Sequence, residues 1–351
     1  MKNVAIVLPN YIDGKLGGTQ TFVDNLILAL SNDSNLRLEI FLPKGQVIGG
    51  VSQDKIVNFF HKPIPFFGAI FNVIKTGSPK FQQRLLDFDV AYFPLQAARS
   101  IKTLKVTSVV TIHDVQHLDL PTLFSRLTRY YRKRFYDRQA KYFSYICTSS
   151  EFSRNRIIEQ LDLNGRDVFV HHSGIENVGN RKKCKRQNFI LYPANSWPHK
   201  NHLRLFEAFG NFAGESDLIK LFLTGDPPSI PIHLRKVIFD LGRVEKEQLF
   251  ELYRSARGLV FPSFYEGFGF PPLEAMSAGC PTAVSTSGSL PEICEEASIY
   301  FNPFSVKEIE QALRELCRSG NSITEAGLRQ AGKYQWGFTA TKYSNLFQSI
   351  E

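Results

Sequence analysis

The feature that most constrains this chain is a repeating alternation of short apolar runs with longer helical patterns. The runs are rich in β-branched and aromatic residues, and in the first half they lie at residues 4–8, 38–42, 89–93, 108–112, 145–148 and 168–171. In the second half they resume at residues 189–193, 221–224, 237–240, 259–262 and 282–285. Strands that alternate with helices are typical of parallel βαβ units. The sequence therefore predicts an α/β protein with doubly wound sheets.

A polar, strongly basic stretch at residues 177–187 interrupts this alternation. A chain of 351 residues exceeds what one hydrophobic core usually supports, so two domains are expected. We predict a first domain at 1–176, a linker at 177–187, a second domain at 188–332 and a terminal helix at 333–351. The terminal helix is able to cross back to the first domain. Because both halves share one pattern, we expect two similar sheets facing each other across a cleft.

Composition excludes several classes of protein. The five cysteines are odd in number, widely spaced and without a Cys-x-x-Cys pair, which argues against a disulfide framework or a zinc cage. A reducing, cytoplasmic compartment is the simpler expectation. The apolar run at residues 4–8 is too short for a signal peptide, and no stretch approaches the roughly 18 apolar residues of a spanning helix.

The formal net charge of +9 attracts polyanions such as nucleic acids, anionic membranes and phosphorylated substrates. No helix-turn-helix, zinc-finger or RNA-binding pattern is visible, so we expect no nucleic-acid partner. The segment 126–141 interleaves seven basic residues with aromatic ones. Such a helix fits an anionic membrane surface that carries a lipid-linked acceptor, although a solvated charged face explains it as well.

The segment that carries most chemistry runs from Glu266 to Glu274, between an apolar run and a helical pattern at 273–278. Proline is favoured in the first turn of a helix, where the remaining N–H groups and the helix dipole form an anion site. Gly267 and Gly269 allow the backbone to approach a diphosphate, and the two carboxylates can accept hydrogen bonds from sugar hydroxyls. A solvated loop glutamate and a helix-start glutamate are the plain alternative.

This segment resembles the Glu-x7-Glu signature of retaining GT-B glycosyltransferases of family 4. The resemblance covers essentially the whole carboxy-terminal half, with matching segments at 241–244, 249–256, 265–281 and 288–292. In the amino-terminal half it is patchier, at 17–20, 111–114, 148–153 and 172–175. It implies the GT-B architecture, two facing Rossmann-like domains, and a nucleotide-sugar donor.

The resemblance also implies roles for individual residues. Glu274 is expected to bind the ribose hydroxyls and Glu266 the transferred hexose, while Lys200 neutralises the diphosphate. The other implied donor-binding residues are Gly267, Phe268, Gly269, Arg243 and Val244. Many family members carry an arginine shortly before the lysine, where this chain has the Tyr-Pro-Ala-Asn-Ser sequence at 192–196. A second phosphate-binding cation is therefore absent or comes from elsewhere, with Arg243 and Arg204 as candidates.

Two features of the first half join this expectation. Gly17 and Gly18 follow the first apolar run and precede a helical pattern, where their amides can meet the donor phosphates. A Gly-Gly pair alone usually means only a turn. His113 follows the apolar run at 108–112, and the resemblance places it close to the donor sugar, as a catalytic residue with Glu266 and Lys200. A structural histidine is the alternative.

Several metal and nucleophile signals are rejected. Asp87-Phe88-Asp89 mimics a metal-binding Asp-x-Asp but leads into an apolar run. His113 with His117, and His199 with His202, have no third ligand nearby, so we expect no metal. Ser149-Ser150-Glu151 lacks a nucleophile elbow and is better explained as a helix cap.

The resemblance implies a retaining, metal-independent transfer in which the departing phosphate takes the acceptor proton. We expect no cofactor beyond the donor, with GDP-mannose favoured and UDP-glucose, UDP-galactose and dTDP-rhamnose open. The acceptor is a saccharide or lipid-linked saccharide of surface-polysaccharide or O-antigen synthesis, at the inner face of the cell membrane. The alternatives are a nucleotide-sugar epimerase of the same architecture and a non-enzymatic polyanion-binding protein.

Overall fold

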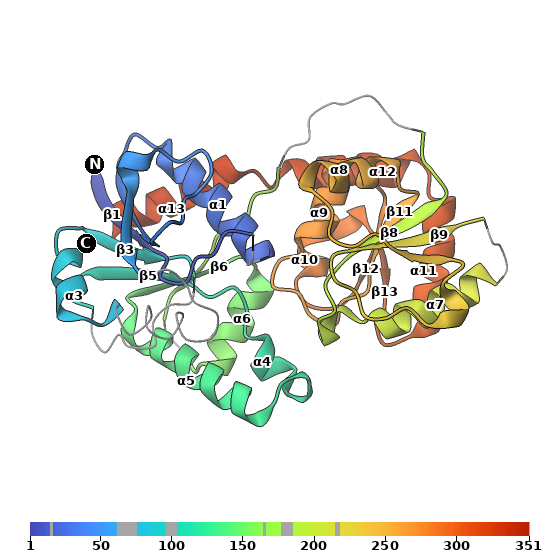
Figure 1. The fold of residues 1–351 in the computed structure, drawn as a ribbon, viewed down its shortest axis with the longest axis horizontal. Coiled ribbons are helices and arrows are strands. Elements are labelled where there is room, and N and C mark those ends of the chain that lie inside the picture. The colour runs from blue at the N-terminus through green and yellow to red at the C-terminus, as the bar shows by residue number, and fades with distance from the viewer. Residues whose placement is uncertain are drawn as a thin grey trace. The chain divides into compact units, whose positions relative to one another are not determined.

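The computed structural model describes residues 1–14, 17–61, 76–95, 104–163, 166–176, 185–214 and 218–350. The chain forms two compact units: unit 1 comprises Met1–Gly174 and Trp336–Glu351, and unit 2 comprises Ile175–Gln335 (Figure 1). Ile175 pairs with Gln335 in an isolated parallel bridge, so the two chain crossings lie side by side. The expected linker at 177–187 falls largely outside the described residues.

Unit 1 is built on a seven-stranded sheet in which every neighbouring pair is parallel. Its strand order is β3-β2-β1-β4-β5-β6-β7. The strands are β1 Lys2–Val7, β2 Leu36–Pro43, β3 Ile56–Phe60, β4 Val90–Phe93, β5 Thr107–Thr111, β6 Tyr145–Thr148 and β7 Val168–Val170. The side chains of the central strands are largely buried, because helices cover both faces of the sheet.

The helices of unit 1 form two layers. They are α1 Gly18–Ser31, α3 Pro79–Leu85, α4 Gln116–Asp119, α5 Arg126–Tyr142, α6 Glu151–Gln160 and α13 Trp336–Ser349, with short 3-10 turns η1 Gln53–Lys55 and η2 Pro121–Leu123. Helices α1 and α13 contact each other over one face. The terminal helix begins at Trp336, later than the expected 333, and Tyr343 anchors it by a hydroxyl contact of 3.0 Å to Thr111 of β5.

Unit 2 repeats the same topology with six parallel strands in the order β10-β9-β8-β11-β12-β13. The strands are β8 Phe189–Pro193, β9 Lys220–Thr224, β10 Ile238–Asp240, β11 Gly258–Phe261, β12 Thr282–Ser285 and β13 Ile299–Phe301. The helices are α7 His202–Ala213, α8 Lys246–Ser255, α9 Phe270–Ser277, α10 Leu290–Cys294, α11 Val306–Arg318 and α12 Asn321–Gly332, with 3-10 turns η3 Pro198–Lys200, η4 Ile232–Leu234 and η5 Glu295–Ala297.

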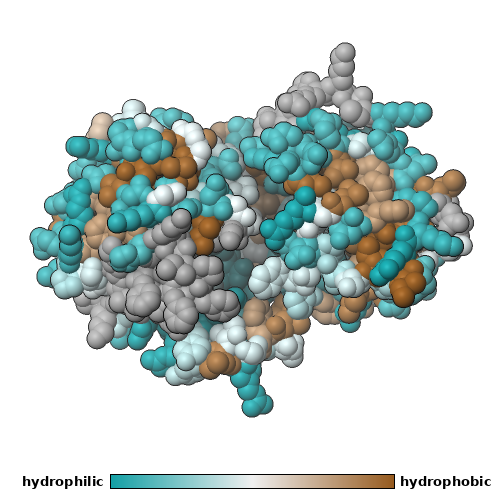
Figure 2. Space-filling view, viewed as in Figure 1, coloured by the Kyte–Doolittle hydropathy of each residue, from teal (hydrophilic) through white to brown (hydrophobic). Residues whose placement is uncertain are grey.

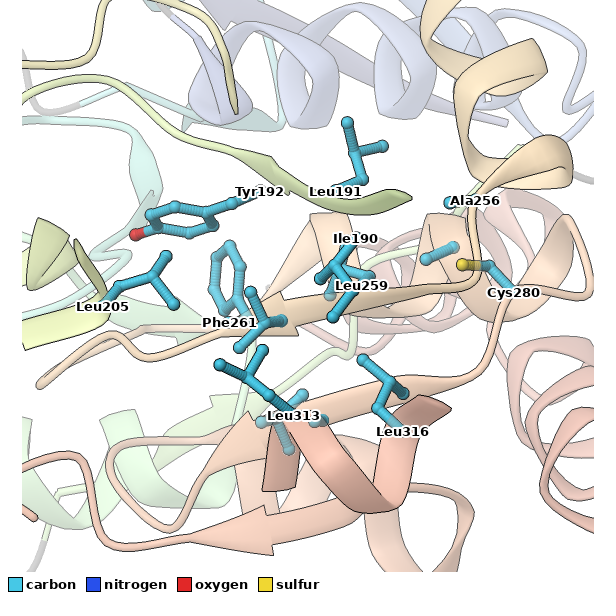
Figure 3. Packing of buried hydrophobic residues seen from close by; sticks show 14 of the residues in the cluster. Ile190, Leu191, Tyr192, Leu205, Ala256, Leu259, Phe261, Cys280, Leu313 and Leu316 are labelled. Atoms are coloured by element: carbon cyan, nitrogen blue, oxygen red, sulfur yellow. The ribbon is translucent and has the colours of Figure 1, made fainter. Parts of the chain in front are cut away.

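The core of unit 2 lies on both faces of its central strands. Ile190 and Leu191 of β8, Leu259 and Phe261 of β11 and Leu313 of α11 are fully buried there (Figure 3). Helices α7 and α11 pack together, whereas α8, α10 and α12 each contact α9. A strand order that reverses beside the first strand of the sheet creates a crevice at the carboxyl ends of the two strands flanking the switch point. In unit 2 those strands are β8 and β11, so the loops that follow them are the natural place for a ligand site.

The sequence prediction of two doubly wound parallel sheets is confirmed. Strands β3 and β13 were not predicted, and both lie at the edge of their sheets. The helix expected at 273–278 is corrected to Phe270–Ser277, because Gly269 caps it in the left-handed region and both following prolines fit the first turn. Among the described residues no helix is both long and apolar enough to cross a bilayer.

Candidate functional site

The turn that carries Lys200 follows β8 and is fixed to the neighbouring loops. Asn201 adopts a left-handed conformation with φ of 61° and is 4% exposed. Its amide nitrogen donates to the carbonyls of Pro262, at 3.0 Å, and Pro303, at 2.8 Å. The backbone N–H of Phe264 donates to the carbonyl of His199 at 2.8 Å. These bonds tie the turn to the loop after β11, which carries Glu266.

Lys200 and Glu266 form a direct ion pair. Lys200 Nζ lies 2.6 Å from Glu266 Oε1, and the two side chains are 17% and 13% exposed. The ammonium also lies 5.1 Å from the ring centroid of Phe261, the last residue of β11. A partly buried pair is screened less by water than a surface pair, and its arrangement is correspondingly better defined. The structure therefore brings two predicted site residues together, 66 positions apart in sequence.

The loop that follows β12 supports the Glu266 loop. The N–H of Ser289 donates to the carbonyl of Glu266 at 3.1 Å, and the Ser289 hydroxyl donates to the carbonyl of Phe268 at 2.9 Å. Gly288 has φ of +69°, and a Cβ there would lie 2.6 Å from the Glu266 nitrogen. Only glycine allows this approach. The resemblance had marked residues 288–292 without assigning them this supporting role.

Helix α9 begins directly after the Glu266 loop. Its N-terminal cap, Gly269, has φ of 103° and ψ of 56°, and a Cβ at this position would lie 2.8 Å from Leu290 Cδ2. The glycine therefore serves both the left-handed turn and the close packing against α10. The first turn of α9 contains no acidic residue, so its positive dipole end is left without a carboxylate of its own.

Glu274 lies on α9 and is held by a residue that the sequence did not single out. The hydroxyl of Tyr253, on α8, donates to Glu274 Oε2 at 3.2 Å. Burial raises the pKa of Glu274 to about 7, and the hydrogen bond from Tyr253 opposes that rise. Tyr253 is itself fully buried, and burial together with the neighbouring carboxylate raises its pKa well above the ordinary value. With a pKa of about 7, the carboxyl group of Glu274 changes its protonation state near neutral pH and is not permanently charged.

The two candidates for a second phosphate-binding cation lie in different places. Arg243 is exposed, with Val244 beside it, in the loop between β10 and α8. In the part of unit 2 that the structure describes, no hydrogen bond or ion pair joins Arg243 to Lys200 or Glu266. Arg204 lies over the rings of Phe264, at 5.3 Å, and Phe304, at 6.0 Å. Its Nη1 lies 3.5 Å from Asn201 Oδ1, so it is fixed beside the Lys200 turn.

Unit 1 contains the remaining predicted site residues. Gly17 caps α1 with φ of 58° and ψ of −139°, and Gly18 is the first residue of the helix. Among the described residues, no atom lies within 4 Å of a Cβ built on Gly17. A glycine at this position is required by the backbone angles alone.

His113 follows β5 and is fixed by two contacts. Its Nε2 lies 3.2 Å from the carbonyl oxygen of Pro94, and its ring meets the ring of Phe22 of α1 edge-on at 4.9 Å. Burial lowers the pKa of His113 to about 4, so the ring is neutral. Because a carbonyl can only accept, Nε2 carries the proton and Nδ1 is the acceptor.

The rejected motifs have structural roles. Asp87 pairs with Arg84, and Asp89 accepts the N–H of Asn3 at 2.7 Å. Ser150 caps α6 by accepting from the N–H of Ser153 at 3.1 Å, as expected for this segment. In the described parts of both units, no group of three or more His, Cys, Asp or Glu side chains is arranged to hold a metal ion.

Two family models together match nearly the whole chain. The model described as glycosyl transferases group 1 matches residues 175–333, which is almost all of unit 2. The model described as glycosyltransferase family 4 matches residues 16–177. The two matches meet at the boundary between the units.

The chain is also similar to individual proteins of known name, in sequence or in fold. The O-antigen chain mannosyltransferase B of Escherichia coli is 28% identical over 268 residues, 69% of this chain and 70% of that protein. The O-antigen chain mannosyltransferase RfbU of Salmonella typhimurium is 25% identical over 224 residues, 61% of this chain and 62% of its own length, which is less than two thirds. The structure of sucrose-phosphate synthase from Thermosynechococcus elongatus superposes with a TM-score of 0.77, at 15% identity, over 99% of this chain and 98% of that one. This superposition shows that the fold is shared.

Proposed function

Because this chain belongs to the group 1 glycosyltransferases of family 4, we propose that it transfers a hexose from a nucleotide-diphosphate sugar to a hydroxyl of an acceptor. The single observation that carries this proposal is the contact between Lys200 and Glu266, which lie in the loops after β8 and β11. These strands flank the switch point of the unit 2 sheet, where doubly wound sheets bind nucleotides. Glu274 follows on the next helix, α9.

Each donor-site residue is assigned to a different part of the donor. Glu274 accepts hydrogen bonds from the ribose hydroxyls, and Glu266 contacts the hydroxyls of the transferred hexose. Lys200 neutralises the diphosphate, with Arg204 as the second cation because it is held beside the same turn. In the free protein the ammonium of Lys200 is paired with Glu266. An incoming diphosphate competes with Glu266 for this ammonium and weakens the pair. The carboxylate of Glu266 is then released toward the hexose.

The reaction breaks the bond between the anomeric carbon and the diphosphate oxygen. The acceptor oxygen forms the new bond to the anomeric carbon on the face that the phosphate leaves, and its proton passes to the departing phosphate oxygen. The configuration of the sugar is retained. Lys200 stabilises the negative charge that grows on the leaving phosphate, and a fixed ammonium needs little reorganisation to do so. The ring of His113 is neutral, and its Nε2 already donates to the carbonyl of Pro94. We assign it a role beside the transferred sugar, with Nδ1 as a hydrogen-bond acceptor.

We assign the donor as GDP-mannose and the acceptor as a saccharide or lipid-linked saccharide of surface-polysaccharide or O-antigen synthesis. Two relatives named as O-antigen chain mannosyltransferases support this assignment. UDP-glucose, UDP-galactose and dTDP-rhamnose are the competing donors. The proposed site of action is the inner face of the cell membrane, and neither a metal ion nor a further cofactor is assigned.

A thermal-shift panel tests the donor. GDP-mannose is expected to raise the melting temperature most, because a ligand that binds only the folded state stabilises it by mass action. Transfer is then followed with GDP-[14C]mannose and a membrane-extracted acceptor, with release of GDP as the second readout. An epimerase would instead change the free donor sugar without an acceptor. A polyanion-binding protein would show no preference among the nucleotide sugars.

A further inference from the structure

The helix α5, Arg126–Tyr142, has an unusual distribution of charge. It carries seven cations and a single acid, Asp137. Its first turn has no acidic residue and begins with Arg126, so a cation lies at the positive end of the helix dipole. Cations at this end destabilise a helix, whereas anions stabilise it. An anion bound at this end would remove the conflict.

A pocket of about 280 Å³ opens between α5 and α4, Gln116–Asp119. Arg126, Arg129 and Lys133 line it from α5, at the spacing that puts side chains on one helix face. His117 lines it from α4. Arg126 and Arg129 therefore make this wall of the pocket basic, whereas Lys133 is already paired with Asp137.

Two buried groups of this pocket have no partner in the protein. His117 is fully buried, and neither of its ring nitrogens has a hydrogen-bond partner among the described residues. Nε of Arg129 is also buried without a partner in the same described part of the chain. Buried polar groups are nearly always paired, so unpaired donors at a pocket wall point to a ligand that supplies acceptors. Burial lowers the pKa of His117 to about 4, so the ring is neutral and one nitrogen is free to donate.

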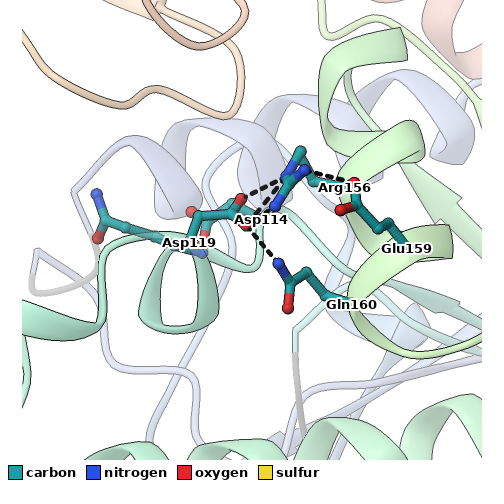
Figure 4. A network of polar contacts seen from close by, with 6 residues as sticks. Asp114, Asp119, Arg156, Glu159 and Gln160 are labelled. Carbon is teal, nitrogen blue, oxygen red and sulfur yellow. Dashed lines mark hydrogen bonds and ion pairs between the residues drawn. The ribbon is translucent and has the colours of Figure 1, made fainter.

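The acids near the pocket are already engaged. Both carboxylate oxygens of Asp119 accept from Arg156 Nε at 3.0 Å, and Oδ1 also accepts from Gln160 Nε2 at 2.9 Å (Figure 4). Asp137 pairs with Lys133 at 2.9 Å. The two arginines of the pocket therefore have no carboxylate counterion in this region of the described chain, so both are available to an external anion.

Large exposed side chains beside the pocket indicate where that anion is found. Leu127, Tyr130 and Tyr131 are 64%, 57% and 50% exposed and share the neighbouring face of α5. Figure 2 shows hydrophilic and apolar side chains mixed along the lower edge of unit 1, where α5 runs in Figure 1. A leucine and two tyrosines next to arginines are typical of a helix lying in the interface of a bilayer. A site for free phosphate would not need these exposed leucine and tyrosine side chains beside it.

We propose that the pocket between α4 and α5 binds the terminal phosphate group of a membrane lipid, with Leu127, Tyr130 and Tyr131 in the bilayer interface. A phosphomonoester presents three oxygens, enough for Arg126, Arg129 and His117 together. A phosphodiester is flanked on both sides by carbon and presents only two unsubstituted oxygens. The pocket shares no residue with the set assigned to the donor, so the proposal goes beyond the transferase function.

Vesicle flotation with the full chain tests this site. Vesicles of phosphatidylcholine are mixed with phosphatidic acid or with phosphatidylglycerol, at proportions that give the same surface potential and at physiological salt. We expect at least tenfold stronger binding to phosphatidic acid, because only its phosphate is a monoester. Equal binding at equal surface potential would show nonspecific attraction and overturn the site, as would binding to neither.

Matched variants separate the pocket from general charge. Arg129→Gln and Arg126→Gln are expected to abolish the preference for phosphatidic acid. Arg138→Gln removes the same charge from α5 outside the pocket and is expected to keep the preference, with overall binding weakened by no more than about fivefold. Equal losses in all three variants would contradict the proposal. Arg126 is exposed at the helix start, so its variant stays informative if Arg129→Gln fails to fold.

Two controls complete the design. Inorganic phosphate at the same concentration as the lipid phosphate should leave the protein on the vesicles, and its release would assign the pocket to a free phosphate instead. Binding of GDP-mannose to each variant is measured in parallel. Loss of lipid selectivity with donor binding intact tests the pocket alone, whereas absence of donor binding in the unaltered protein would count against the transferase proposal alone.

Discussion

Lys200 Nζ lies 2.6 Å from Glu266 Oε1, and the two residues belong to the loops that follow β8 and β11, the neighbouring strands at the switch point of the unit 2 sheet. The pair explains how a partly buried ammonium is kept in place before a donor arrives. It also joins two residues that the resemblance assigned to different parts of the donor. A diphosphate can compete for this ammonium because it offers more charge than one carboxylate.

Removal of the ammonium is predicted to disable transfer. Lys200→Met is expected to lower kcat/KM at least about 100-fold, because the charge on the leaving phosphate loses its fixed counterion. It should also destabilise the fold by about 1–3 kcal/mol, since Glu266 is left partly buried and unpaired. Kinetics with GDP-mannose and chemical denaturation measure the two effects. Lys236→Met, at an exposed lysine of unit 2, is the matched control and should change neither.

The stability of the free protein is predicted to depend on Glu274. Its pKa is about 7 in the folded protein against 4.5 as an ordinary value. Between these values the folded chain binds more protons than the unfolded chain, so stability falls as pH rises from about 4.5 to 7. Glu274→Gln should remove this decline and be more stable by about 1–3 kcal/mol at pH 8. Urea unfolding at pH 5 and pH 8 measures the change in the free energy of unfolding between these pH values. If the variant shows the same decline with pH as the unaltered protein, the assignment is wrong.

The hydrogen bond from Tyr253 is predicted to set the pH range of donor binding. The ribose hydroxyls donate to the ionised form of Glu274, so nucleotide affinity should rise as pH increases through about 7. Tyr253→Phe removes the bond that favours the ionised carboxylate and should move this midpoint upward. Calorimetric titration with GDP between pH 5.5 and 8.5 follows it. A midpoint that stays in place, or moves down, would show that Tyr253 does not act on Glu274.

A methyl group at Gly288 is predicted to displace the Glu266 loop. Gly288→Ala places a Cβ 2.6 Å from the Glu266 nitrogen at a positive φ, so the loop must shift. We expect a loss of about 2 kcal/mol or more in stability and a fall in kcat/KM. Gly332→Ala, where a Cβ meets no atom of the described residues within 4 Å, is the control and should be nearly neutral. Equal effects in the two variants would contradict the supporting role of Gly288.

Most of the fold was predictable because the buried parallel strands are continuous apolar runs. The strands that were missed lie at the sheet edges. Ile299–Phe301 is three residues long, and Ile56–Phe60 is only partly buried and contains Asn58, so neither run stands out from its neighbours. Their pairing depends on the strands beside them, β12 and β2, rather than on their own composition.

The site was predictable where the chain itself carries the pattern. Glu266 and Glu274 are close in sequence, and their spacing was recognisable. The resemblance also named Lys200, and the structure brings it to Glu266. Tyr253 was not predicted, because its contact with Glu274 arises from the packing of α8 against α9. No sequence motif or spacing indicates such a contact. The support from Gly288 is likewise visible only when the loop after β12 meets the loop after β11.

A crystal structure of the protein with GDP-mannose tests the central claim most directly. The account predicts diphosphate oxygens within hydrogen-bond distance of Lys200 Nζ, ribose hydroxyls on the Glu274 carboxylate and hexose hydroxyls on Glu266. A nucleotide sugar bound at any other place in unit 2, with the Lys200–Glu266 pair intact and away from the ligand, would contradict it.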